Sequence, residues 1–250
     1  MPGLDDLAVD LWPLVVSYLE PCEIRQLGTC DRATWRATIR FLAWRYSTVT
    51  RWARQDAKRV CYLVVQQPHQ LEPGDLPEGL TSLTFGAASN FNQAIVPGVL
   101  PRHLTKLEFD SSFKRRLTPG VLPPSLKDLS FNGGFDQPLE VKVLPAGLEK
   151  LDLGEDFDQP LEVGVFPPRL QELSFGIMFN QALQPGVLPP GLKRLTFGSG
   201  FDQPLVGDIL PRTLTRLTLS WRYDHTELGD SLPTGLWTIG PLRTTWVRIQ

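Results

Sequence analysis

Side chains that could do chemistry recur through this chain at a fixed interval, and the first candidates are Asn and Asp residues. Each follows an aromatic residue, and they are spaced by multiples of 22 residues: Asn92, Asp136, Asp158, Asn180, Asp202 and Asp224. Neighbouring carboxylates can divide general acid and base roles when their surroundings separate their pKa values. Asn and Asp also share an acceptor oxygen that caps backbone N–H groups in turns. Six equivalent positions favour capping over catalysis.

The other residue types used in catalysis and metal binding form no recognisable constellation. The three histidines, His69, His103 and His225, stand at different places relative to the 22-residue interval. The three cysteines form no C-x-x-C pair, so a zinc site is not expected, and their odd number suits a reducing compartment. They are Cys22, Cys30 and Cys61. Because P-loop and nucleophile-elbow motifs are also missing from the sequence, we expect no enzyme activity, metal or cofactor.

Composition narrows the class of protein further. The chain has 250 residues, 42% of them hydrophobic, and a net charge of −2. That charge gives no general reason to expect nucleic-acid or membrane binding. No apolar run approaches the ~18 residues that span a bilayer. Acidic residues (Asp5, Asp6 and Asp10) stand where a signal peptide carries basic ones. We therefore expect a soluble protein of the cytoplasm or nucleus.

Two recurring phrases indicate the elements that position these side chains. One reads Phe-Asn/Asp-Gln-Pro/Ala-Leu, and the other reads Leu-Pro-x-x-Leu-x-x-Leu-x-Phe/Leu, as in Leu100 to Phe109. A fixed interval of this length with this leucine pattern is typical of a solenoid. Leucine and phenylalanine two residues apart share one face of a strand, whereas Leu-Pro marks a bend. We predict about eight short strands in a parallel sheet, with repeats over residues 67–240.

Position 16 of each repeat, counted from the lead aromatic residue, should point outward from this sheet. After Ser82, its charges alternate in sign over five strands before a final arginine: Lys106, Asp128, Lys150, Glu172, Arg194 and Arg216. Opposite charges on adjacent strands stabilise a sheet by ~0.2–1 kcal/mol each. The row either satisfies its own charges or forms part of a recognition face for another protein. Both interpretations stay open.

The loop after each strand differs in two repeats. Most repeats have small residues at positions 21 and 22, whereas two have Ile177-Met178 and Trp221-Arg222. Apolar residues at such exposed places suggest a contact patch for a target protein. Local packing is the alternative, and for Trp221 against the end of the chain it is the favoured one.

Residues 1–58 precede the repeats and are expected to be helical. Apolar residues recur there at three- and four-residue spacing: Leu4, Leu7, Leu11, Leu14, Val15, Tyr18 and Leu19. So short a module buries little core and should lean on the solenoid or on a partner. Strand-forming residues over 59–66 predict an N-terminal capping strand, and residues 241–250 predict a C-terminal one. The predicted fold class is α+β.

The N-terminal residues resemble the F-box. The pattern is Leu7-x3-Leu11-x2-Leu14-Val15-x2-Tyr18-Leu19-Glu20-Pro21-x2-Ile24-x2-Leu27-x2-Cys30-x-Arg32-x2-Trp35. It departs from the family at Leu7-Ala8, where the family usually has Leu-Pro. The resemblance implies a helical surface that docks a Skp-type adaptor and, through it, a cullin. That surface would be built from Leu7, Leu11, Leu14, Tyr18, Leu19, Ile24, Leu27 and Trp35.

The repeated phrase resembles the FNIP repeat, a relative of the leucine-rich repeat, over about residues 67–240. In that family an F-box often precedes the repeats, and the family is typical of amoeboid eukaryotes and their large DNA viruses. A viral chain would act in the host cytoplasm. The two resemblances imply a substrate-recognition adaptor of a cullin-RING ubiquitin ligase, whose repeats bind a target protein. The alternative is a non-catalytic scaffold whose N-terminal helices only cap the solenoid.

Overall fold

The computed structural model describes most of the repeat region and less of the chain's ends. The described residues are 49–55, 60–65, 71–74, 76, 78–86, 89–220, 222–223, 228, 232, 236–239 and 245–249. Residues 1–48, with the F-box-like pattern, lie outside them, as does Trp221. The helical interpretation of residues 1–58 is wrong at its end, because Val49–Gln55 forms a strand. Its Val-Thr-x-Trp start suits a strand, and its backbone groups pair with the next strand along the chain.

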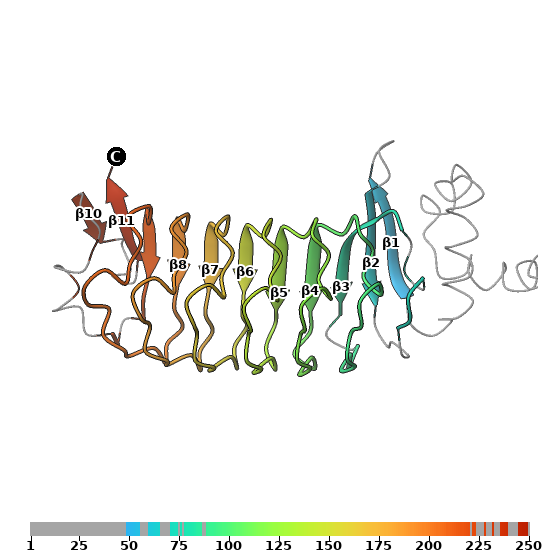
Figure 1. Cartoon of the computed structure of the whole chain (residues 1–250), viewed down its shortest axis with the longest axis horizontal. Helices are drawn as coiled ribbons and strands as arrows, with labels where there is room; N and C mark the ends of the chain where they lie inside the picture. The colour runs from blue at the N-terminus through green and yellow to red at the C-terminus, as the bar shows by residue number, and fades with distance from the viewer. Residues whose placement is uncertain are drawn as a thin grey trace, which may run out of the picture.

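The strands form one sheet that runs the length of the molecule (Figure 1). Along the sheet they lie in the order β1-β2-β3-β4-β5-β6-β7-β8-β9-β11-β10, and β2 to β9 are all parallel. The bounds are β1 Val49–Gln55, β2 Val60–Val65, β3 Leu80–Phe85, β4 Lys106–Phe109, β5 Asp128–Phe131, β6 Lys150–Asp152, β7 Glu172–Ser174, β8 Arg194–Thr196, β9 Arg216–Thr218, β10 Leu236–Ile239 and β11 Thr245–Ile249.

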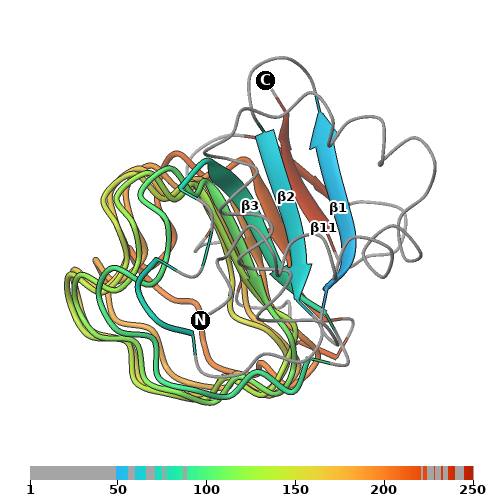
Figure 2. The ribbon, with the colours of Figure 1, turned by 90° about the vertical axis from the view of Figure 1, so that its right-hand side faces the viewer.

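The described residues contain no helix; the return path of each turn is made of loops and bends. From β4 to β9 equivalent residues lie opposite one another at intervals of 22, for example Lys106 opposite Asp128 and Leu107 opposite Leu129. Viewed along the long axis, the turns overlie one another (Figure 2). The predicted parallel-sheet solenoid is therefore confirmed, with about six regular turns.

Two columns of stacked aromatic rings run through the core, beside buried leucines and valines. The lead aromatics form one column, with ring centroids 5.9 Å apart between Phe91 and Phe113 and 6.1 Å apart between Phe113 and Phe135. Phenylalanines at position 19 form the second column, 4.0 Å from the first at the pair Phe109 and Phe113. Leu153 interrupts the second column. This stacking follows from the repeat, because successive turns place the same residue at the same position and each ring therefore packs on an equivalent ring in the turns on either side.

The bend at position 8 needs a left-handed backbone. Its φ is +90° at Gly98, +86° at Gly120, +90° at Gly164 and +85° at Gly186. Lys142 takes the same place with φ of +72°. A side chain in this region is strained by about 1 kcal/mol, because its Cβ crowds the following carbonyl oxygen.

Lys142→Gly is therefore expected to stabilise the protein by about 1 kcal/mol and to raise Tm by about 2–4 °C. Thermal unfolding followed by circular dichroism measures this shift. The reverse change at the next equivalent position, Gly164→Lys, is the matched control and should lower Tm by a similar amount. Shifts in the same direction for both variants would contradict the explanation.

Antiparallel strands end the sheet on both sides. β1 runs antiparallel to β2 at one end. At the other end β11 lies between β9 and β10 and is antiparallel to both. The predicted repeats through residue 240 are wrong here, because β10 does not continue the parallel series beside β9. A reversed hairpin replaces the next turn, since a solenoid needs an atypical final element to close its core and edge.

Candidate binding surface

The recurring Asn and Asp residues connect neighbouring turns. The Asn92 side-chain oxygen accepts a hydrogen bond from the Lys114 N–H at 3.0 Å, one repeat further on. Asp136 accepts in the same way from Asp158, and Asp158 from Asn180. The predicted capping role is confirmed, but the capped N–H belongs to the next turn. Because the side-chain oxygens of Asn92, Asp136, Asp158 and Asn180 each accept from a backbone N–H of the next turn, these four residues form a structural ladder rather than a catalytic pair.

The ladder has a second donor in most turns. The Nε2 group of Gln159 donates to Asp136 at 2.7 Å, and that of Gln181 donates to Asp158 at 3.0 Å. Lysine has no acceptor, so Lys114 interrupts the series. This explains why the repeated phrase pairs Asn or Asp with Gln: one acceptor serves both a main-chain and a side-chain donor of the following turn.

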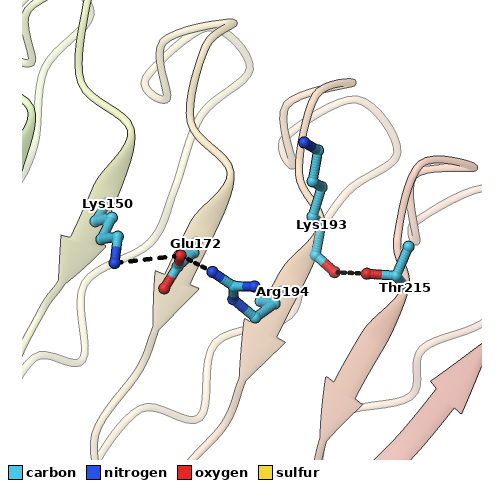
Figure 3. A network of polar contacts seen from close by, with 5 residues as sticks. All are labelled: Lys150, Glu172, Lys193, Arg194 and Thr215. Atoms are coloured by element: carbon cyan, nitrogen blue, oxygen red, sulfur yellow. Dashed lines mark hydrogen bonds and ion pairs between the residues drawn. The ribbon is translucent and has the colours of Figure 1, made fainter.

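The outward face of the sheet carries the predicted row of charges. In the centre Glu172 is shared by two cations, Lys150 with an Nζ to Oε1 distance of 3.4 Å and Arg194 on the other side (Figure 3). Towards the start of the row Lys106 contacts Glu108 on its own strand at 3.8 Å. The row therefore satisfies its own charges only over β6 to β8.

Arg216 is the exception at the end of the row. It lies directly opposite Arg194 in the β8–β9 pair, and its side chain is exposed. Its opposite residue on β11 is Val247, which carries no charge. Within the described part of the chain Arg216 forms no ion pair. The structure thus places two guanidinium groups on the adjacent strands β8 and β9, and only Arg194 is paired with a carboxylate, that of Glu172 on β7.

The Asp152 carboxylate lies on the same face and titrates abnormally. Loss of solvent around the carboxylate raises its pKa above the usual 3.8, and the negative charge of Asp128 raises the pKa further. The hydrogen bond that the Gly154 N–H donates to Asp152 acts in the opposite direction and lowers the pKa. The Glu149 pKa is lowered from 4.5, chiefly by the hydrogen bond from Lys127 at 2.8 Å and by the charge of that lysine.

Asp152→Asn is expected to stabilise the protein at pH 7, by less than about 1 kcal/mol because the side chain is only partly shielded and the remaining solvent screens its charge. A raised folded-state pKa means that ionised Asp152 destabilises the fold above that pKa, and the penalty disappears as pH falls below 3.8. Asn keeps the oxygen that accepts from Gly154 at 3.0 Å. The advantage of the variant should therefore fade on acidification, as urea unfolding at several pH values would show.

Glu149→Gln is the control for this pH dependence. The lowered folded-state pKa of Glu149 means that ionisation stabilises the fold above its usual value of 4.5 and that this contribution is lost as pH falls through the folded pKa. The variant should be less stable than the parent at pH 7, with the difference fading in acid. Parallel pH trends for the two variants would contradict the assignment.

Ile177 and Met178 project from the loop after β7. Their side chains are 50% and 58% exposed. Hydrogen bonds hold the loop on both sides, from the Met178 N–H to the Glu155 carbonyl at 2.9 Å and from the Gly200 N–H to the Ile177 carbonyl at 3.0 Å. The equivalent residues of the turns on either side are Glu155-Asp156 and Ser199-Gly200. Packing does not cover this apolar pair, which leaves it available for contact.

No catalytic centre emerges elsewhere in the described part of the chain. No group of three or more His, Cys, Asp or Glu residues is placed to hold a metal ion there. A small hollow of about 170 Å³ lies beside Tyr223 and Leu228. The Tyr223 hydroxyl accepts from the Leu205 N–H at 3.3 Å and donates to the Gln203 carbonyl at 3.1 Å, so it is committed to the backbone. No helix within the described ranges could cross a membrane.

Comparison with protein families identifies the repeated unit. The model described as FNIP Repeat matches residues 91–134, 135–177 and 179–222, which together make up just over half of the chain. A search of curated proteins gave no match.

A leucine-rich-repeat (LRR) protein is among the solved structures with a similar fold. The crystal structure of CroV588, described as a novel circular LRR protein, superposes with a TM-score of 0.55 and 36% sequence identity. The similarity covers 66% of this chain and 27% of that chain, so this chain corresponds to about a quarter of its relative. YopM from Yersinia enterocolitica WA-314 is 20% identical, with a TM-score of 0.38 over 58% of this chain and 35% of that one.

Proposed function

The chain belongs to the FNIP repeat family, and we propose that it is the target-binding adaptor of a cullin-RING ubiquitin ligase. One observation carries the proposal: the F-box-like pattern from Leu7 to Trp35 lies N-terminal to the repeats in the same chain. A repeat solenoid suits protein binding, because stacked turns present a long rigid surface. The adaptor would act in the cytoplasm or nucleus, or in a host cytoplasm if the chain is viral.

The two parts of the chain would have separate tasks. The adaptor-docking side chains would be those of the F-box pattern: Leu7, Leu11, Leu14, Tyr18, Leu19, Ile24, Leu27 and Trp35. The repeats would hold a target protein near the ligase. Ubiquitin transfer in such ligases takes place on other subunits, so the chain needs no catalytic group of its own.

The described surface supports target binding by the repeats. The sheet exposes charged side chains on its outward face, and the adjacent loops expose Ile177 and Met178. A charged surface beside exposed apolar anchors is a common arrangement in protein interfaces. The rigid backbone of the turns lowers the entropy cost of presenting these groups.

The proposal is tested by mixing the full chain with a purified Skp-type adaptor and following co-elution by size-exclusion chromatography. Leu19→Glu should abolish co-elution while the circular dichroism of the repeats stays unchanged. Lys106→Glu, on the sheet, is the control and should co-elute as the parent does. Failure of the parent chain to co-elute would refute the adaptor function.

A scaffold without a ligase partner is the second candidate. It is favoured by the position of β1, the edge strand at the N-terminal end of the sheet, which directly follows residues 1–48 in the chain. A segment that covers the edge strand of a solenoid serves as its terminal cap, and the scaffold hypothesis assigns that task to residues 1–48. For a cap, Leu19→Glu should lower Tm of the repeats themselves. Unfolding of the variant therefore separates the two candidates.

A further inference from the structure

We propose that the outward face of β8 and β9, with Ile177 and Met178 beside it, binds an acidic segment of a partner protein. A carboxylate of that segment lies between Arg194 and Arg216, and an apolar residue of the segment contacts Ile177 and Met178. The inference gives the chemistry of the target and rests on the proposed function only in taking the partner to be the protein that the repeats recruit.

The first argument is the pattern of charge. The charge at position 16 of the repeat alternates in sign from Lys106 to Arg194, and continuing this alternation would make residue 216 an acid. Arginine stands there instead, directly opposite Arg194. Adjacent strands are about 4.8 Å apart, so like charges at this spacing destabilise the sheet. An incoming carboxylate restores the missing alternation.

The second argument is the hydrogen-bonding capacity of the two arginines. A guanidinium group has five donors in a planar fork that matches a carboxylate. One side of Arg194 is occupied by Glu172, whereas Arg216 has no ion pair with any described residue. A carboxylate between them would accept from both, and such charge-assisted pairs are the stronger kind of hydrogen bond.

The third argument is that the neighbouring strands β5 to β7 repel an acidic partner. Strands β5 to β7 carry three acids, Asp128, Asp152 and Glu172, against the single base Lys150. On strands β8 and β9, position 16 is arginine and position 18 is threonine, so the only charged residues on their outward face are the two arginines. The partner's acidic segment is thus confined to β8 and β9. The exposed pair Ile177 and Met178 adjoins these strands, because the Gly200 N–H of the loop after β8 donates to the Ile177 carbonyl at 3.0 Å.

The apolar pair supplies the second half of the site. Ile177 and Met178 stand immediately beyond the end of β7, in a loop whose backbone is held by neighbouring turns. Methionine adapts to irregular apolar partners, which suits it to a contact surface. The two arginines and the apolar pair together fit a partner segment in which acidic residues flank a leucine or a similar apolar side chain.

The test uses the full chain and a fluorescein-labelled peptide of eight glutamates interrupted by two leucines. Fluorescence anisotropy should show saturable binding that weakens with salt, and the same peptide with glutamine for glutamate should not bind. Arg216→Glu should weaken binding at least tenfold. Lys106→Glu makes the same charge change at the equivalent position on β4 and should leave binding unchanged.

Stability separates a binding role from a structural one. Arg216→Glu completes the alternation with Arg194, so the variant should unfold at the same temperature or higher even as it loses the peptide. Replacing both Ile177 and Met178 with serine should weaken binding of the leucine-containing peptide at least threefold. It should not affect a peptide with glycine in place of leucine.

Equal binding of the peptide by the parent and Arg216→Glu would overturn the inference, as would the absence of binding by the parent. A single-stranded oligonucleotide that binds as tightly and loses affinity equally in Arg216→Glu would overturn the assignment to a protein segment. Co-elution with the Skp-type adaptor is measured on the same variants. Intact co-elution without peptide binding refutes this inference alone, and peptide binding without co-elution refutes the adaptor function alone.

Discussion

Gly176→Ala is expected to lower the free energy of unfolding by about 3 kcal/mol. A Cβ added at Gly176 would lie 1.9 Å from the Gly154 carbonyl oxygen and 2.4 Å from the Glu155 Cα atom. Both obstacles are backbone atoms of the preceding turn, so no side chain can move aside. The turn after β7 would have to separate from the turn after β6.

The same close approach recurs at Gly198, where a Cβ would lie 2.1 Å from the Gly176 carbonyl oxygen. Displacing one turn therefore disturbs the next one too. In a solenoid the stability is carried by contacts between neighbouring repeats, so the loss should lower the cooperativity of unfolding as well as its midpoint. Urea unfolding followed by circular dichroism measures both quantities.

Gly79→Ala is the matched control. Neither glycine has a left-handed backbone, and a Cβ at Gly79 meets nothing within 4 Å. That substitution should be neutral or stabilise by a few tenths of a kcal/mol, because alanine reduces the freedom of the unfolded chain. If the two variants lost equal stability, the backbone contact between turns would not be the cause.

Phe135→Ala is expected to cost about 3–5 kcal/mol. The ring is fully buried in the first aromatic column and stacks on three neighbours. Its centroid lies 6.1 Å from Phe113, 4.1 Å from Phe131 and 6.1 Å from Phe157. Alanine leaves a cavity between the turns and removes the stacking contacts, each of which adds about 0.5–1.5 kcal/mol beyond burial.

Thermal unfolding should show the transition of Phe135→Ala at lower temperature and broadened, since the cavity lies in the middle of the solenoid. Phe131→Leu is the matched control, because Leu153 already occupies position 19 in the next turn. We expect that control to cost about 1 kcal/mol. A loss of 1 kcal/mol or less for Phe135→Ala would show that the columns do not couple the turns.

Much of the fold could be predicted because the repeat is regular. Leu107 and Phe109 are two residues apart, which places both on the inner face, and the structure buries both completely. Because the interval is constant, Lys106 had to lie opposite Asp128 and Glu172 opposite Arg194. The capping role of Asp158 also followed from its recurrence. Ile177 and Met178 could be singled out because most other turns have small or charged residues there.

Other features of the surface depend on geometry that the repeat does not specify. Lys106 contacts Glu108 on its own strand rather than Asp128 across the sheet. Asn92 caps the following turn instead of its own. The stacking of Gly154 and Gly176 has no sequence pattern that distinguishes it from an ordinary turn. A long side chain can reach several possible partners, so the sequence does not specify which one it contacts. The close approach between the backbones of neighbouring turns becomes visible only once the turns are stacked.

The amino-acid sequence by itself determined the 22-residue turn, the two buried columns and the order of side chains along the outward face. It did so because stacking identical units brings each residue beside its equivalent. The tertiary structure alone decided how the series ends, with β1 added before β2 and β11 inserted between β9 and β10. It also decided that Lys106 contacts Glu108 on its own strand and that the uncharged Val247 of β11 lies opposite Arg216. Those outcomes depend on contacts between unlike neighbours, which a repeating pattern does not contain.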